Sequence, residues 1–357
     1  MSEALVIRSS HGDYAVEFSG VEQSLRAEPR SSFFIVDESL ARLQRERLSP
    51  LADHPRKVYV AANETVKTAE HALAMLETIV ASGFRRNERL VAIGGGVVQD
   101  LTGFMASILY RGVDWAFYPT TLVAQADSCI GGKTSINMRG SKNLLGTFHP
   151  PRRITIDTSF LETLPARETR SGIGEMLHYF LFEGFERAEA VAAAHDKLMT
   201  HPRLLTPFVR ASLEIKARLI EVDEFDRDVR NLFNYGHTFG HALEAASEYA
   251  VSHGEAVTWG MDLANELSWR LGLLGLPTLE RMRAVLTSNL PSYALPDERL
   301  SAYFAALSRD KKNTGSTLGC ILTRGPGRME KVQLPIDDHL RGTITDYIRR
   351  ARATVKA

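Results

Sequence analysis

The sequence predicts an α/β domain in residues 1–165 followed by a mainly α-helical domain in residues 166–357. In the first half, short β-rich runs alternate with helical patterns, which is typical of a parallel sheet covered by helices. From about Pro165 onward, helical patterns dominate, and strand signals return only near the C-terminal end. A chain of 357 residues is long enough for two domains, each with its own core.

The first domain is expected to contain short buried strands and an amphipathic helix. Between 65 and 83, the apolar residues Ala69, Leu73, Leu76 and Ile79 recur near one face, as in a helix that packs against a sheet. The β-branched and aromatic runs that we expect to be strands are 32–36, 58–61, 90–94, 115–118 and 153–157.

In the second domain, the apolar residues mostly recur at helical spacing. Two strands are expected near 318–323 and 330–334, and the chain shows no internal repeat and no low-complexity tract. The expected helices are 169–183, 188–199, 207–224, 234–249, 255–271 and 279–289.

The charges of the chain balance, because Lys+Arg and Asp+Glu both number 43. No overall field favours nucleic acid or an anionic membrane, so an anionic substrate would have to be bound by a local cluster of cations. Cys129 and Cys320 are too few for a disulfide framework. The N-terminus lacks the pattern of a secretory signal, and no apolar run reaches the length of a membrane span. We therefore expect a soluble cytoplasmic protein that binds neither nucleic acid nor membranes.

A glycine-rich turn, GGGVVQD at 94–100, follows an expected strand and opens a helical run at 101–109. Glycines at such a junction let the backbone approach a ligand closely, and a helix N-terminus favours a phosphate. The spacing differs from the GxGxxG pattern. The turn is therefore either the pyrophosphate site of a dinucleotide or a tight connection between strand and helix.

The glycine-rich stretch after Thr121 has little periodicity and contains Asp127, Lys133, Lys142 and Asn143. A solvated loop would account for it, but long loops without their own structure tend to be functional in compact domains. Ammonium groups on a glycine-rich backbone suit phosphate and hydroxyl groups. We interpret the stretch as part of a ligand site.

Histidines and a carboxylate of the second domain are candidates for a metal site. His237 and His241 are four residues apart, so in a helix both would face the same side. His253 follows shortly afterwards, and Glu175 lies upstream. Two histidines and a carboxylate with open positions are a common donor set for catalytic zinc. A lone histidine is more often structural than a ligand, and composition does not decide which of these residues bind the metal.

Several motifs occur in order between about residues 62 and 312: GGGVVQD, PTTLVAQADSCIGGKTSIN, SKNLLGTFHPP, GIGEM, RNLFNYGHTFGHALEA and SHGEAV. With them the chain closely resembles the 3-dehydroquinate synthase family of sugar phosphate cyclases. The resemblance implies an N-terminal nucleotide-binding α/β domain, a C-terminal helical domain that binds metal and substrate, and an active site in the cleft between them. It also implies NAD and a divalent metal as cofactors, usually Zn²⁺, with Co²⁺ as an alternative.

The resemblance gives roles at the cofactors to individual residues. Glu175, His237 and His253 would bind the metal, whereas His241 would face the substrate phosphate. Lys133 and Lys142 would lie between NAD and the substrate. The remaining contacts with NAD would come from Glu64, Lys67, Gly95, Gly96, Val97, Val98, Asp100, Thr120 and Thr121.

The resemblance also gives roles at the substrate and at the neighbouring subunit. Asp127 and Asn143 would bind hydroxyl or phosphate oxygens, and either Lys311 or Lys312 would close on the phosphate. Arg111 would reach the phosphate of the neighbouring subunit, which implies a homodimer. The positions that match those holding the substrate carboxylate are Lys216, Arg230 and Asn234.

The family chemistry explains why cations cluster in a chain without net charge. NAD removes a hydride from a ring carbinol, the metal polarises that oxygen, phosphate leaves by β-elimination, and the hydride is returned. Ring opening and an intramolecular aldol closure then give the carbocycle, so NAD is not consumed. The retained carboxylate set indicates a lyase acting on 3-deoxy-arabino-heptulosonate 7-phosphate or a close acidic analogue.

Two positions differ from the family pattern. His178 lies three residues after Glu175, where the family usually has a lysine that faces the same cleft, and a histidine is shorter and can be neutral at pH 7. Gln99 replaces a glycine in the turn before Asp100, which changes the backbone freedom there. The change at His178 leaves open a secondary-metabolic cyclase of the 2-epi-5-epi-valiolone or 2-deoxy-scyllo-inosose synthase type.

Two further classes of protein are to be distinguished from a cyclase. An iron- or zinc-dependent alcohol dehydrogenase with a related fold would consume NAD stoichiometrically. It would not need Lys133, Lys142, Lys216 and Arg230 around one site. A catalytically inactive scaffold would have no use for the complete set of ligands and lysines.

Overall fold

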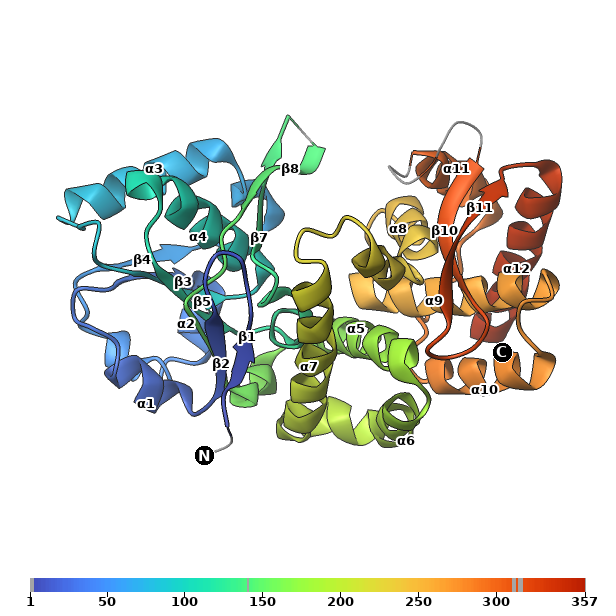
Figure 1. Ribbon diagram of the computed structural model, residues 1–357, viewed down its shortest axis with the longest axis horizontal. Helices are drawn as coiled ribbons and strands as arrows, with labels where there is room; N and C mark the ends of the chain where they lie inside the picture. The colour runs from blue at the N-terminus through green and yellow to red at the C-terminus, as the bar shows by residue number, and fades with distance from the viewer. Residues whose placement is uncertain (1–2, 140, 310–312, 314–316, 357) are drawn as a thin grey trace. The chain divides into compact units, whose positions relative to one another are not determined.

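The computed structural model describes residues 3–139, 141–309, 313 and 317–356, with side chains described as far as residue 352 (Figure 1). The chain forms two compact units. The first, the α/β unit, comprises Met1–Pro165 and Pro202–Phe225. The second, the helical unit, comprises Ala166–His201 and Asp226–Ala357. Among the described residues, no helix is both long and apolar enough to cross a membrane.

A seven-stranded sheet forms the centre of the α/β unit, in the order β1-β2-β9-β6-β5-β3-β4. All neighbouring pairs are parallel except β1 with β2. Strands β5 and β6 are buried at every residue, as expected for a parallel sheet covered on both faces. The strands are β1 (Leu5–Ile7), β2 (Tyr14–Phe18), β3 (Phe33–Asp37), β4 (Lys57–Val60), β5 (Leu90–Gly94), β6 (Trp115–Pro119) and β9 (Arg153–Ile156).

The expected strands of this domain are all present, and β1 and β2 are additional. Strand β1 has only three residues, and Val6 in its centre is 54% exposed, so it carries too little apolar pattern to be recognised. The helices of the unit are α1 (Val21–Arg26), α2 (Glu38–Leu43), α3 (Ala69–Ala81), α4 (Gly96–Ile108) and α7 (Thr206–Val222). Shorter helical turns are η1 (Ser49–Leu51), η2 (Glu64–Val66), η3 (Leu109–Arg111), η4 (Ala124–Ser128), η5 (Thr158–Thr163) and η6 (Pro202–Leu205).

The strand order reverses between β3 and β5. From β3 the chain moves to β4 on one side, and α3 then carries it back to β5 on the other side of β3. In open α/β sheets, ligands bind beyond the carboxyl ends of the strands at such a reversal. Strand β5 ends there at Gly94 and runs directly into α4.

The stretch that we expected to be a long loop has structure of its own. It begins with η4, a single π-helical turn, and continues as an antiparallel hairpin of β7 (Lys133–Met138) and β8 (Ser141–Phe148). Thr134 and Ile136 are buried on one face of β7, whereas Lys133 is exposed and Ser135 and Asn137 are half-buried on the other. The sequence contains this alternation of buried and more exposed residues, but the glycines around it made the segment resemble a loop.

The segment 202–225, which we expected in the second domain, packs with the first. Helix α7 lies against η4, where Ser212 Oγ donates to the Ala126 carbonyl at 2.8 Å. Lys216 Nζ donates to the Asp127 carbonyl and to its Oδ1, each at 2.7 Å. These polar contacts with backbone far away in sequence hold α7 in the α/β unit, and local helical spacing cannot reveal them.

The helical unit consists of helices with one two-stranded sheet, β10 (Thr317–Thr323) and β11 (Met329–Pro335). Helices α11 and α12 were not expected from the sequence; α11 is short and α12 has a strongly polar composition. The helices are α5 (Ala166–Glu183), α6 (Glu186–Thr200), α8 (His237–Ala246), α9 (His253–Arg270), α10 (Leu276–Thr287), α11 (Leu300–Ser308) and α12 (Asp338–Lys356), with the turns η7 (Val229–Asn234) and η8 (Asp297–Arg299).

Candidate active site

Side chains from α5, α8 and α9 meet inside the helical unit. Glu175 lies on α5, while His237 and His253 are the first residues of α8 and α9. One ligand atom from each of them lies within 4.8 Å of the others. Glu175 Oε1 is 3.0 Å from His253 Nε2 and 3.7 Å from His237 Nε2. The structure therefore brings together the residues predicted to bind the metal.

Glycines next to the ligands in sequence allow this close approach of helices. A Cβ atom on Gly174 would lie 2.0 Å from the Gly254 carbonyl oxygen, and one on Gly254 would lie 1.8 Å from the Ser171 carbonyl oxygen. Gly236 has a φ of +81°, and its Cβ would lie 2.7 Å from the Val257 carbonyl oxygen. At Gly174 and Gly254, α5 and α9 thus pack with backbone against backbone, and α9 packs closely on the residue before α8. Each predicted ligand directly precedes or follows one of these glycines, so the contacts fix where the ligands lie.

Acceptors outside the cluster orient both imidazole rings. The Tyr235 carbonyl lies 3.3 Å from His237 Nδ1, and Glu244 Oε2 lies 3.1 Å from His253 Nδ1. Such acceptors favour the tautomer with a proton on Nδ1, which leaves the Nε2 lone pair for a metal. In both rings Nε2 is the atom that faces Glu175.

The chemistry of these groups fits a divalent cation. Glu175 Oε1 is buried, and it accepts no hydrogen bond from the described residues. A buried carboxylate oxygen without a hydrogen bond is costly, and a bound cation would stabilise it. Although burial opposes a charge on His253, the carboxylates of Glu175 and Glu244 raise its pKa well above the usual value. The cluster therefore favours positive charge, and two histidines with one carboxylate suit catalytic zinc.

His241 and His178 lie beside the cluster. The ring of His241 is 5.5 Å from those of both His237 and His253, and His241 with Glu244 and His253 forms a second possible ligand group. His178 lies on α5 one turn after Glu175, and its ring centroid is 5.0 Å from that of His237. The His178 side chain is buried against aromatic rings, including that of Phe233 at 5.5 Å.

Other residues predicted to contact substrate lie near one another in η7. Arg230 is buried at 7% exposure, and Asn234 Nδ2 donates to the Asn231 carbonyl at 2.9 Å. Lys311 and Lys312, predicted to close on the phosphate, lie outside the described residues.

In the α/β unit, the glycine turn is tightly packed on one side and open on the other. A Cβ on Gly94 would lie 2.5 Å from Val98 Cγ2, and one on Gly95 would lie 2.8 Å from Thr121 Cγ2. Gly96 is exposed and has no atom within 4 Å of its Cβ position. The N-terminal amide groups of α4 begin here, and they attract a phosphate. The Val98 side chain is fully buried, so only its backbone is placed to contact a nucleotide.

The last residue of the motif, Asp100, ties the start of α4 to the β7–β8 hairpin. Its Oδ2 lies 2.6 Å from Lys67 Nζ, and its Oδ1 accepts from the Ser135 amide at 3.0 Å. Lys67 Nζ also donates to Asn143 Oδ1 at 2.7 Å. Burial raises the pKa of Asp100, although the Lys67 ammonium acts in the opposite direction. The structure thus joins three predicted site residues, Lys67, Asp100 and Asn143, in one network.

Two further predicted substrate residues, on η4 and α7, pair with each other. Asp127, at the end of the π-helical turn η4, pairs with Lys216 of α7 at 2.7 Å. Lys216 is only 6% exposed. A buried ammonium is stable only with such a partner, so the pair is fixed by η4 and α7 together.

Three further predicted residues of the α/β unit have exposed side chains. Lys133 and Lys142 are exposed on opposite strands of the hairpin, and Arg111 is exposed with a φ of +66°. Three residues predicted to contact NAD have hydrogen bonds within the unit: the Thr120 amide donates to the Gly94 carbonyl at 3.0 Å, Thr121 Oγ1 accepts from the Ala124 amide at 3.2 Å, and Glu64 Oε2 accepts from Asn137 Nδ2 at 2.9 Å.

Sequence reasoning missed several residues that support the site. Glu244 lies three residues after His241 and orients His253, and a carboxylate one helical turn from a histidine was a usable signal. Ser135 and Tyr235 act partly through backbone groups, which no sequence pattern reports.

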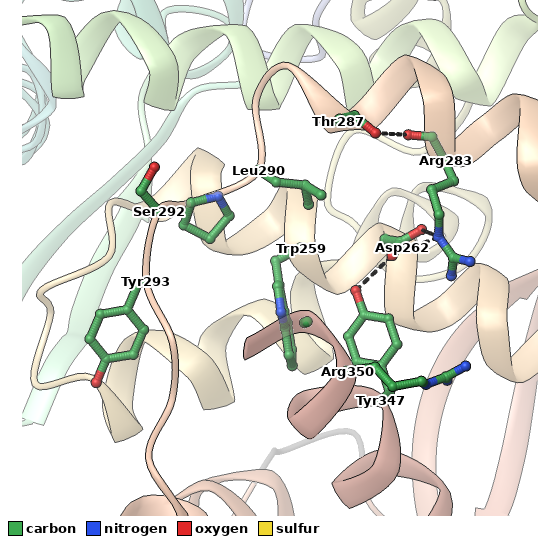
Figure 2. A pocket seen from close by; sticks show the side chains of 11 residues that line it. Trp259, Asp262, Arg283, Thr287, Leu290, Ser292, Tyr293, Tyr347 and Arg350 are labelled. Atoms are coloured by element: carbon green, nitrogen blue, oxygen red, sulfur yellow. Dashed lines mark hydrogen bonds and ion pairs between the residues drawn. The ribbon is translucent and has the colours of Figure 1, made fainter. Parts of the chain in front are cut away.

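A cavity of about 500 Å³ lies elsewhere in the helical unit, between α9, α10 and α12 (Figure 2). Asp262 accepts hydrogen bonds from Arg283 Nε at 2.9 Å and from the Tyr347 hydroxyl at 2.8 Å. The predicted site residues are absent from the described lining. The charges of Asp262 and Arg283 offset each other. The cavity lies where three helices pack together.

Known proteins are similar to this chain both in sequence and in fold. The family model of the 3-dehydroquinate synthase N-terminal part matches residues 57–171, and that of the C-terminal part matches residues 172–313. The 3-dehydroquinate synthase of Thermoanaerobacter sp. (strain X514) is 34% identical over 333 residues, which are 91% of this chain and 93% of that protein.

Two solved cyclases share the fold over nearly the whole chain. A 2-deoxy-scyllo-inosose synthase complexed with carbaglucose-6-phosphate, NAD⁺ and Co²⁺ has a TM-score of 0.85 at 24% identity, covering 98% of this chain and 100% of that one. The 2-epi-5-epi-valiolone synthase from Streptomyces hygroscopicus subsp. jinggangensis 5008, with NAD⁺ and Zn²⁺ bound, has a TM-score of 0.81 at 28% identity, covering 98% and 99%.

The fold is that of the sugar phosphate cyclases. The matched models and the curated relative narrow the class: the chain belongs to the 3-dehydroquinate synthase family of lyases. The predicted family, fold class and type of enzyme are confirmed.

Proposed function

We propose that this chain is a 3-dehydroquinate synthase, which converts 3-deoxy-arabino-heptulosonate 7-phosphate into a carbocycle with release of phosphate. The curated relative matched over 91% of the chain bears that name. The observation that carries the choice of an acidic substrate is the presence of two buried cations at the positions assigned to its carboxylate. Lys216 is 6% and Arg230 7% exposed.

The α/β unit holds NAD and the helical unit holds a divalent metal, with zinc as the first candidate. The solved valiolone synthase contains NAD⁺ and Zn²⁺. When bound, NAD supplies reversible hydride transfer, and the metal supplies Lewis-acid polarisation of a substrate oxygen. Glu175, His237 and His253 hold the metal. NAD is bound by the glycine turn and its neighbours, namely Glu64, Lys67, Gly95, Gly96, Val97, Val98, Asp100, Thr120 and Thr121.

The polar residues of the chain orient the substrate. Lys216, Arg230 and Asn234 bind the carboxylate, for which an arginine offers a bidentate, charge-assisted contact. Asp127 and Asn143 bind hydroxyl groups. The departing phosphate is a dianion, so groups that can carry positive charge favour its loss; these are His241, Lys133, Lys142 and either Lys311 or Lys312.

We further propose a homodimer in which Arg111 reaches the phosphate bound by the neighbouring subunit. Arg111 is exposed in the left-handed turn η3, where it is available to a second copy of the chain. Mixing inactive Arg111→Ala with inactive Glu175→Gln should restore activity, because one mixed site would then be complete. No recovery in mixtures that exchange subunits would contradict the proposal.

Product analysis tests the proposed activity. The enzyme with NAD and zinc is incubated with the heptulosonate phosphate, sedoheptulose 7-phosphate or glucose 6-phosphate. Phosphate release is measured, and the products are identified by NMR. We expect fast release only with the acidic sugar.

A second candidate is a secondary-metabolic cyclase of the 2-epi-5-epi-valiolone or 2-deoxy-scyllo-inosose synthase type. The observation that favours it is His178, which stands buried beside His237 where the family usually has a lysine. A wild-type preference for an uncharged sugar phosphate would replace the first proposal by this one.

A further inference from the structure

Gln99 has a buried side chain that is held at both of its polar ends. Its Nε2 donates to the Ser128 carbonyl at 2.6 Å, and its Oε1 accepts from Ser128 Oγ at 2.7 Å. The residue is only 6% exposed. A reciprocal pair of this kind fixes the amide orientation, and each group would be left unsatisfied without the other.

The partner of Gln99 directly follows Asp127. Ser128 is the last residue of η4, and π-helical turns are uncommon and frequently found at functional sites. The turn is held from α7 by Ser212, which binds the Ala126 carbonyl, and by Lys216, which binds Asp127. Gln99 holds the same turn from α4, so Asp127 lies between two anchors on different helices.

Gln99 also lies three residues after Gly96, in the first turn of α4. The exposed glycine faces the proposed nucleotide site, and the Gln99 side chain points to the turn that carries the proposed substrate residue. A glycine at position 99 would leave the Ser128 carbonyl without its amide donor. The start of α4 therefore connects the proposed nucleotide and substrate sites through one side chain.

We propose that Gln99 is a positioning residue that holds η4, and with it the Asp127–Lys216 pair, in the orientation that binds the hydroxylated substrate. The proposal rests on the proposed substrate role of Asp127 and Lys216. It assigns to Gln99 no contact with the substrate itself.

Gln99→Ala is compared with Gln44→Ala as a matched control. Gln44 is likewise a buried glutamine of the α/β unit, 3% exposed, and its Nε2 donates to the Phe160 carbonyl and to Thr163 Oγ1, each at 2.7 Å. Gln99→Ala loses two hydrogen bonds and Gln44→Ala loses three, since Gln44 Oε1 also accepts from Arg47 Nη1 at 3.0 Å, but only Gln99 binds η4. We expect Gln99→Ala to lower kcat/KM at least tenfold, mainly through a higher substrate KM, with the Kd of NAD within about twofold. Gln44→Ala should keep both constants.

Gln99→Glu adds a readout that a purely structural role would not give. In this variant the protonated carboxyl group can donate to the Ser128 carbonyl, whereas the carboxylate can only repel it. Burial raises the pKa of such a carboxyl, so kcat/KM of Gln99→Glu relative to wild type should rise as the pH falls. Gln99→Met, which has no polar atom of this kind, should show no such rise. Wild-type kcat/KM in Gln99→Ala and Gln99→Met would overturn the proposal.

Hydrogen–deuterium exchange separates this proposal from the proposed function. In the holoenzyme, Gln99→Ala should speed amide exchange in 124–130, and Gln44→Ala should not. If wild type converts none of the three sugar phosphates, the proposed function fails, and exchange in 124–130 alone decides whether Gln99 holds η4. Unchanged exchange there would overturn the positioning role.

Discussion

Glu175 is the ligand on which metal binding should depend most. Its side chain is 4% exposed, and its Oε1 faces the Nε2 atoms of two histidines. We predict that Glu175→Gln keeps the fold but binds zinc at least a hundredfold more weakly, because a neutral amide replaces the only anionic ligand. Metal analysis after dialysis and circular dichroism measure the two effects.

Glu244→Gln is the matched comparison for that experiment. Glu244 contacts His253 Nδ1 rather than the ligand atoms, so it should weaken zinc binding only about 10- to 100-fold. Equal losses in the two variants would mean that Glu175 is not a direct ligand, and the group of His241, Glu244 and His253 would then be preferred.

Arg230 should select for an acidic substrate. We predict that Arg230→Ala costs about 2–4 kcal/mol in kcat/KM on the heptulosonate phosphate, since a desolvated carboxylate loses its partner. The same variant should lose far less on sedoheptulose 7-phosphate, which lacks that group. Equal losses on both sugars would show that Arg230 does not bind a carboxylate.

At the scale of residues, the spacing of side chains in the sequence indicated that histidines and carboxylates could bind a metal, but not which of them do. The separation of four residues drew attention to His237 and His241, and only the family resemblance kept His237 and replaced His241 by Glu175 and His253. The spacing could not decide, because the ligands come from three helices. Their positions depend on glycine contacts between those helices, which no local pattern records.

At the scale of elements, the contact between α5 and α9 leaves no room for a side chain. We predict that Gly254→Ala destabilises the protein by about 1–3 kcal/mol, because its Cβ would lie 1.8 Å from the Ser171 carbonyl oxygen. It should also weaken zinc binding, because both helices carry a ligand. Thermal unfolding and zinc titration measure these effects.

Gly342→Ala provides the control for the helix contact. Gly342 lies in α12, is exposed, and has nothing within 4 Å of its Cβ position. Replacing it should leave zinc binding unchanged and should slightly raise stability, as alanine favours a helix. A destabilisation equal to that of Gly254→Ala would argue against the steric explanation.

Glu266 joins α9, α10 and α12 through three arginines. Its Oε1 accepts from Arg270 and Arg350 at 3.0 and 2.7 Å, and its Oε2 from Arg283 at 3.0 Å. Burial alone would raise the pKa of Glu266, but the hydrogen bonds from Arg350, Arg283 and Arg270 lower it to about 2. A lowered pKa in the folded state stabilises the fold above the unfolded value and loses this effect as the pH falls toward 2.

We therefore predict a pH dependence that belongs to this carboxylate. Between pH 4.5 and about 2, wild type should lose about 3 kcal/mol more of its unfolding free energy than Glu266→Gln does. Denaturant unfolding at several pH values measures the difference. Glu280→Gln, which removes an exposed carboxylate on α10, should follow wild type; parallel curves for wild type and Glu266→Gln would contradict the prediction.

The elements that sequence reasoning found are those with long, regular apolar patterns. The central strands and α5 to α10 fall in that group, with ends displaced by a few residues. The β7–β8 hairpin was missed because glycines precede β7 and interrupt β8, and α12 because its overall composition is strongly polar, although its apolar residues recur at helical spacing. Tertiary contacts stabilise these elements where their own sequences give weak signals.

At the scale of the whole molecule, family membership predicts how NAD is used. Since the reaction leaves no net oxidation, many product molecules should form for each NAD supplied. NADH absorbance should not rise at steady state. One NADH released per product would place the enzyme with the alcohol dehydrogenases, whose chemistry consumes the cofactor.

The first stretch of the α/β unit ends at Pro165, and the chain returns to this unit for 202–225. Helical composition placed α7 in the second domain. Its buried partners on η4, Ala126 and Asp127, are distant in sequence, so only the folded structure reveals them.

The return of α7 to the α/β unit has a consequence for how the protein is made. When residue 165 leaves the ribosome, the whole central sheet has been synthesised, but Ser212 and Lys216 have not. The carbonyl groups that these residues bind stay without them until all of α5 and α6 have also emerged. Domains usually fold as units in the order of synthesis. Here a nascent chain stopped at residue 165 would carry an unfinished α/β unit, so the first half of this enzyme matures only after part of the second has appeared.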